Sequence, residues 1–115
     1  MSSNSRAEVV PVVLTPHENA DSLSVVNVFA FTCVVNTEQW KGIDKAIYIT
    51  PDTIVKVSRP EFSWLDQGRP TERIKVKKLR GIVSMGLLIP APPEAEIGQD
   101  FWNELELERY EPEIG

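Results

Sequence analysis

The sequence predicts an all-β domain, and three observations favour that class. Runs rich in valine, isoleucine and phenylalanine recur from Glu8 to Pro90, as is typical of strands. Turn-forming residues such as Pro51 and Asp52 separate these runs, and the pattern has little helical periodicity. With 115 residues, 42% hydrophobic and 25% charged, the chain has the size and composition of one soluble globular domain.

Five runs are expected to form strands. They are residues 8–14, 23–36, 45–50, 73–79 and 86–90. Pro11 predicts that the first strand lies at a sheet edge or contains a bulge, because proline cannot donate to a strand ladder. The second run is long enough to form either one bent strand or a hairpin that turns near Ala30.

A short helical turn is expected at residues 36–42. Asn36 or Thr37 would cap it, Trp40 would pack inward, and Gly42 would end it. Such a turn would close one end of a barrel. The strand pattern fits a small barrel or sandwich, and the chain length favours a five-stranded OB-fold-like barrel over residues 1–93. His17, in the connection between the first two strands, is expected to pack on its neighbours rather than to bind a ligand.

The charge is divided unevenly along the chain. The whole chain has 17 acidic and 12 basic residues, and eight of the acidic residues follow Pro93, where Arg109 is the lone base. Prolines at the start of this region mark a boundary. Residues 94–115 are therefore expected to form an acidic tail or linker, with residues 91–115 outside the barrel or extended. Phe101 and Trp102 would pin this tail to the body.

The segment "RIKVKKLRGIVSMGLLIP" (73–90) concentrates positive charge in an otherwise acidic protein. Its cations are Arg73, Lys75, Lys77, Lys78 and Arg80. Like charges on one face repel, and a nucleic-acid phosphate backbone would supply the counterions. The alternative is a solvated edge strand whose lysines prevent aggregation. No aromatic residue is interleaved with these cations, so nothing here indicates that base identity is read.

A single strand with one bulge is expected for residues 73–79. With the bulge at Lys77–Lys78, the apolar residues of this run would face the core and alternate cations would share the outer face. The expected core residues are Ile74, Val76 and Leu79. The expected outer-face residues are Arg73, Lys75 and Lys77.

Several classes of chemistry find no support in the sequence. The lone Cys33 and the single His17 argue against a disulfide and a zinc site, and suggest a reducing, cytoplasmic location. No run of ~20 apolar residues is present. The stretch "KGID" from Lys41 looks like the start of the K-x-D-G motif of nucleotidyl transferases. The match fails, because two residues separate Lys41 from Asp44 and Lys45 follows in place of glycine. We therefore expect no catalytic residue and no cofactor in this chain by itself.

Four segments nevertheless resemble one family. "HENADSL" (17–23), "AIYIT" (46–50), "LRGIVSMGLL" (79–88) and "RYEPE" (109–113) are similar to the template-dependent RNA ligases of the Deinococcus type, which carry an OB domain at the N-terminus. The resemblance runs from about Val10 to Glu113, although Glu18 stands where the family usually has proline. The same framework also resembles the tRNA-binding OB domains of synthetases and their partners.

The ligase resemblance implies a division of labour. This chain would be an excised OB domain that grips a nicked duplex containing RNA. A covalently linked nucleotidyltransferase domain, downstream of it, would use ATP and a divalent metal (Mg or Mn) to seal a nick with an RNA 3′-hydroxyl, as in RNA repair. Gly81 and Gly86 would permit close turns, and Ser84 would bond the backbone or a phosphate. Two alternatives stay open, namely a tRNA-binding module that works in trans and a protein-interaction barrel that docks a partner through its acidic tail.

Overall fold

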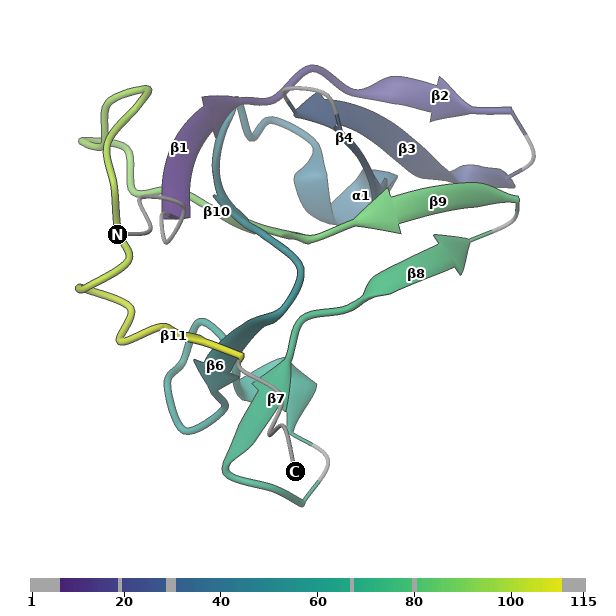
Figure 1. Ribbon diagram of the computed structural model, residues 1–115. Helices are drawn as coiled ribbons and strands as arrows, with labels where there is room; N and C mark the ends of the chain where they lie inside the picture. Colours follow the sequence, from purple (N-terminus) through teal and green to yellow (C-terminus); the bar gives the residue numbers. More distant parts are fainter. Residues whose placement is uncertain (1–6, 19, 29–30, 67, 80, 111–115) are drawn as a thin grey trace.

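Short antiparallel strands build the fold, which confirms the predicted all-β class (Figure 1). The computed structural model describes residues 7–18, 20–28, 31–66, 68–79 and 81–110. Within these ranges the strands form three three-stranded sheets and one two-stranded ribbon. Besides strands, the described residues form the helical turn α1 (Thr37–Trp40) and the 3-10 turn η1 (Ser63–Leu65). Neither of these helices is long enough to span a membrane.

The central sheet contains three strands in the order β1, β5, β10. Their bounds are β1 (Ala7–Pro11), β5 (Lys45–Ile49) and β10 (Leu87–Pro90). The middle strand, β5, is buried on both faces, so its successive side chains enter two different apolar clusters. Ile47 and Ile49 pack in one cluster, whereas Ala46 and Tyr48 pack in the other. Because β1 is an edge strand of this sheet, the placement of Pro11 at an edge is confirmed.

A second sheet and a helical turn cover one face of the central sheet (Figure 1). Its strands are β2 (Thr15–His17), β3 (Ala20–Val28) and β4 (Phe31–Asn36). Val28 pairs with Phe31, so the long run is a hairpin and not one bent strand. Asn36 caps α1, because its Oδ1 accepts from two backbone N–H groups at 3.0 and 3.2 Å. Trp40 is buried, as predicted, and so is His17.

The segment from Arg73 to Leu79 is not one bulged strand, and this prediction was wrong. Its first part ends β7 and its second part forms β8, and the two strands belong to different sheets. The third sheet holds β11 (Glu108–Arg109), β6 (Thr53–Lys56) and β7 (Thr71–Arg73). The ribbon holds β8 (Val76–Leu79) and β9 (Ile82–Met85). No bulge interrupts β8, since Lys77 and Lys78 pair in register with Ser84 and Val83.

Ile74 lies at the crossing between the two sheets and is 6% exposed, as expected of a core residue. Its N–H donates to the Thr53 carbonyl at 2.8 Å, and its own carbonyl accepts from the Asp52 N–H at 2.7 Å. Val76, by contrast, is 52% exposed, so its predicted place in the core was wrong. The side chain of Leu79 lies outside the described residues.

The acidic segment contributes to the core of the barrel. Leu105 and Leu107 are buried in the same cluster as Ile47, and Phe101 and Trp102 pack against that cluster as predicted. The segment also pairs with the body, since β11 adds to β6 and the Ala7 N–H donates to Asp100 Oδ1 at 2.9 Å. The division into a domain and a linker at Pro93 stays a prediction, but residues 95–107 help to build the fold.

Candidate nucleic-acid interface

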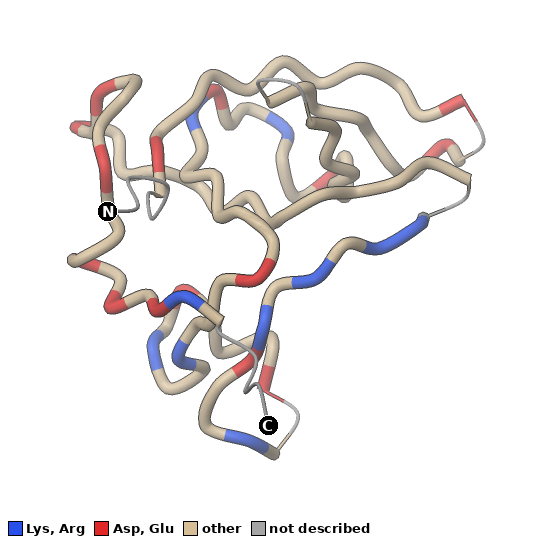
Figure 2. The backbone as a smooth tube through the Cα atoms, viewed as in Figure 1, with Lys and Arg blue, Asp and Glu red and all other residues tan. Residues whose placement is uncertain are grey.

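A groove of about 400 Å³ brings most of the predicted cations together. Residues of η1, β7, β8 and β9 line it, together with the loops that join these elements. Its polar lining consists of Arg69, Glu72, Arg73, Lys75, Lys77 and Ser84. Figure 2 shows the basic positions following the chain from β7 into β8. The cations therefore share a concave surface and are not scattered over the outside of a barrel.

The change of sheet at Ile74 explains why the cations converge. Because Ile74 is buried and bonded to the backbone of residues 52 and 53, the chain is fixed at the point where it leaves one sheet for another. Lys75 follows at once, and both it and Lys77 are exposed. The two lysines line the same groove, as their positions two residues apart require on a strand-like path.

The two arginines of the groove are held by other protein groups. The Arg73 guanidinium lies 4.3 Å from the centre of the Tyr110 ring, and its Nε is 3.7 Å from Asp52 Oδ1. Arg69 forms an ion pair of 3.1 Å with Glu72. Stacking on an aromatic ring fixes a guanidinium in orientation without removing its charge. These arginines therefore add positive potential to the groove, but their side chains are already engaged.

The lysines of this segment have no such partners. Lys75, Lys77 and Lys78 are exposed, and none of them pairs with an acidic residue in the part of the chain that the structure describes. The other lysines bond to an acidic side chain or to backbone carbonyls; they are Lys41, Lys45 and Lys56. Uncompensated lysines beside one another are unfavourable, and an anionic ligand would relieve that repulsion.

The remaining predicted site residues lie less centrally. Lys78 is exposed on β8 but does not line the groove. Arg80 lies outside the described residues. Ser84 is 7% exposed, and its Oγ accepts a hydrogen bond from the Val34 N–H at 2.9 Å. Ser84 was expected to bond either the backbone or a phosphate, and its bond to the backbone joins β9 to β4. Its contact with a phosphate stays a prediction.

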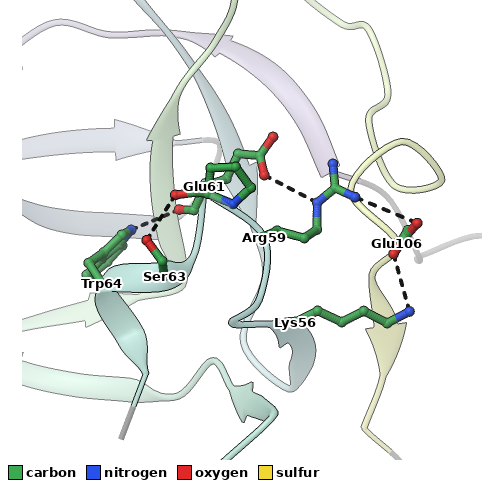
Figure 3. Close-up of polar contacts among 7 residues, drawn as sticks. Lys56, Arg59, Glu61, Ser63, Trp64 and Glu106 are labelled. Atoms are coloured by element: carbon green, nitrogen blue, oxygen red, sulfur yellow. Dashed lines mark hydrogen bonds and ion pairs between the residues drawn. The ribbon is translucent and has the colours of Figure 1, made fainter.

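Trp64 is a residue of this groove that sequence reasoning missed. It lies on η1, is 62% exposed and lines the groove together with Lys75 and Lys77. Its Nε1 donates to the Glu61 carbonyl at 2.9 Å, which satisfies the polar group of the indole (Figure 3). In the sequence it sits in an irregular stretch between Pro60 and Gly68, where no periodicity indicates which way it faces.

No catalytic constellation occurs among the described residues. Cys33 is buried and donates to the Met85 carbonyl at 3.3 Å, and burial raises the pKa of its thiol to about 11, so it is a neutral thiol near neutral pH. The Tyr48 hydroxyl donates to the same carbonyl at 2.6 Å, and burial raises the pKa of Tyr48 as well. Lys41 is exposed and pairs with Glu38 at 3.6 Å. No group of three metal-ligating side chains is found in the described ranges.

Comparison with known proteins identifies the fold family and several similar solved structures. The OB-fold domain family matches residues 8–91. Solved structures of Naegleria gruberi RNA ligase superpose on almost the whole chain. A mutant in the apo form gives a TM-score of 0.81 at 25% identity over 99% of this chain, and a mutant with ATP and Mn gives 0.80 at 24% over 96%. The chain spans 37% of each ligase chain. No curated protein sequence matches it significantly.

Proposed function

Since the chain belongs to the OB-fold domain family, we propose that it is the nucleic-acid-binding accessory domain of an ATP-dependent RNA ligase. Two findings support this proposal. The fold is similar to that of an RNA ligase over nearly the whole length of this chain, and the chain spans about a third of that ligase. The described residues also offer a groove lined by basic side chains.

The observation that carries the proposal is that the lysines of the groove are exposed and unpaired with acidic groups among the described residues. Lys75 and Lys77 lie exposed in a concave surface, without acidic partners among the described residues. Each phosphate that such a lysine neutralises releases condensed counterions, which favours binding of any nucleic acid. Arg73, Lys78 and Arg80 belong to the same segment, and their contact with nucleic acid stays a prediction. Phosphate contacts of this kind position a duplex without reading its sequence.

The division of labour that the resemblance implies is part of this proposal. A covalently linked nucleotidyltransferase domain would use ATP and a divalent metal to activate a 5′-phosphate, and it would join that end to an RNA 3′-hydroxyl at a nick during RNA repair in the cytoplasm. The stretch from Lys41 departs from the lysine motif of nucleotidyl transferases, and Lys41 is exposed and paired with Glu38. In this proposal the chain holds the nucleic acid, and the linked domain transfers AMP.

A binding comparison tests the proposal. Fluorescence anisotropy at low salt would measure the affinity of the chain for a nicked duplex with an RNA 3′-hydroxyl, the same duplex without a nick, a tRNA and an unstructured single strand. We expect the nicked duplex to bind at least as tightly as the tRNA. Clear preference for tRNA would favour a tRNA-binding module that works in trans. Absence of binding to all four would favour a protein-interaction barrel.

A further inference from the structure

We propose that Trp64 is a stacking platform for one unpaired base of the bound nucleic acid, with the phosphates beside that base held by Lys75 and Lys77. This inference rests on the proposed function and deepens it, because it states what part of the nucleic acid enters the groove. A phosphate track alone would accept any duplex. A stacking platform requires a nucleotide whose base has left the helical stack, as at a frayed strand end or in a single-stranded flank.

Trp64 presents an apolar ring that is available for stacking, as its exposure and its hydrogen bond indicate. Six large hydrophobic residues are exposed among the described residues, and Trp64 is the one of these that lines the groove. Its indole N–H is bonded to the Glu61 carbonyl, so the exposed surface that remains is largely the apolar ring. A tryptophan usually finds a partner for both its apolar body and its N–H. Here the N–H has one, whereas the ring is open to solvent.

The short turn that carries Trp64 is held by several contacts (Figure 3). Ser63 Oγ donates to the Pro60 carbonyl at 3.4 Å. Arg59 Nε lies 3.2 Å from Glu61 Oε1, and its Nη1 lies 3.7 Å from Glu106 Oε2. The residue that accepts the indole hydrogen bond is therefore tied through Arg59 to the acidic segment. A ring that is fixed before binding loses little conformational freedom when a base stacks on it.

Trp64 also lines a neighbouring, more apolar hollow with Trp40 and Leu88, but the basic lining of the groove favours a nucleotide on the groove side of the ring. Basic side chains line the same groove, and the lysines among them have no acidic partners in the described part of the chain. An aromatic ring beside cations is the arrangement by which proteins hold single-stranded nucleic acid, since every base has a face that can stack and every nucleotide has a phosphate. A protein partner for this groove would have to be acidic and would have to bring an apolar group to the ring.

A comparison of normal and abasic strands tests the proposal. The full chain and its Trp64→Ala variant would be titrated with a short labelled oligonucleotide and with the same strand in which the central nucleotides lack their bases. The parent should bind the normal strand about tenfold more tightly than the abasic strand, because stacking on one aromatic ring has about that effect. In Trp64→Ala the two strands should bind alike. The dependence of affinity on salt should be the same in both proteins, because Trp64 carries no charge.

A control variant and a measurement of folding separate the loss of stacking from other causes of weaker binding. Ile97→Ala removes an apolar side chain that is 54% exposed and does not line the groove, so it should leave both affinities unchanged. Circular dichroism would show that each variant is folded. An unchanged ratio of normal to abasic affinity in Trp64→Ala would overturn the stacking proposal while leaving the phosphate track intact. If the parent bound the nicked duplex but neither strand, the stacking proposal would be overturned and the proposed function kept. If the parent also failed to bind the nicked duplex, both proposals would be overturned.

Discussion

Replacing Gly86 with alanine should destabilise the fold far more than the same substitution at Gly42, Gly68 or Gly98. Gly86 lies between β9 and β10 with φ +100°. A Cβ at this position would lie 2.6 Å from the Ile49 carbonyl oxygen and 2.7 Å from a ring carbon of Tyr48. Ile49 cannot easily retreat, because it pairs with both β1 and β10 in the central sheet. The Tyr48 ring is fixed as well, since its hydroxyl donates to the Met85 carbonyl.

The magnitude follows from two separate costs. A left-handed backbone costs an alanine about 1–2 kcal/mol, and forcing an extra methyl group into a packed site costs about 1–3 kcal/mol. The sum of about 2–5 kcal/mol is a large part of the ~5–15 kcal/mol by which a typical domain is stable. The melting temperature should fall by roughly 10 °C or more. Urea unfolding followed by circular dichroism would measure the change in the free energy of unfolding.

The control for this experiment is Gly42→Ala. Gly42 also has a positive φ of 82°, but no atom would lie within 4 Å of a Cβ placed there. That variant should show the backbone cost alone, about 1–2 kcal/mol. The difference between the two variants therefore isolates the contact with Ile49 and Tyr48. If Gly86→Ala unfolded at the same urea concentration as Gly42→Ala, the close packing of the β9–β10 junction on the central sheet would be refuted.

Three further predictions concern stability. Burial raises the pKa of Cys33 from 9.0 to about 11, so its neutral thiol contributes fully to the free energy of unfolding below pH 9.0, and that contribution is lost as the pH rises toward 11. In urea unfolding, Cys33→Ala should therefore lose less stability over this pH range than the parent. Leu107→Ala should cost about 2–5 kcal/mol in the same assay, because this side chain is buried in the core, and a cost near zero would mean that the acidic segment is a free tail. Asn36→Ala should cost about 0.5–2 kcal/mol by removing the cap of α1. Asn36→Asp should keep most of the stabilisation by the cap, because a carboxylate oxygen also accepts from the N–H groups of the first turn.

The elements that sequence reasoning located correctly are those fixed by local chemistry. The capping of α1 by Asn36 depends on residues within one turn, and the reversal at Pro51-Asp52 depends on two adjacent residues, with Asp52 at φ 66°. In both cases the information lies within a few positions, so the sequence pattern is sufficient. The hairpin of β3 and β4 was one of two interpretations of residues 23–36, because the same alternation also fits one bent strand.

The parts that were missed depend on which strands pair. "RIKVKKL" alternates apolar and basic residues, and such alternation is compatible with one strand or with two. The burial of Ile74 and the exposure of Val76 follow from bonds to residues 52 and 53, which no local pattern reveals. The acidic segment did carry a signal, since "ELELE" (104–108) alternates leucine with glutamate. The negative charge of the segment favoured a solvated linker, whereas Leu105 and Leu107 are buried in the core.

The sequence predicted part of the basic groove. Three of the five predicted cations, Arg73, Lys75 and Lys77, line it, and Trp64 lines it with them. Trp64 could not be assigned from the sequence, because no periodicity in the stretch between Pro60 and Gly68 indicates which way it faces. The groove therefore contains an aromatic residue, although the basic segment that lines it has none.

The most direct test of the central claim is the salt dependence of nucleic-acid binding after removal of two lysines. Affinity for a duplex would be measured over a range of salt concentrations for the parent, for Lys75→Ala with Lys77→Ala, and for a control with the same loss of charge, Lys41→Ala with Arg109→Ala. If each lysine contacts one phosphate, the slope of log affinity against log salt should become shallower by about 1.8 in the groove variant, at ~0.9 per contact. The control should keep the slope of the parent. An unchanged slope and affinity in the groove variant would contradict the account, because the lysines would then serve only to protect an exposed strand.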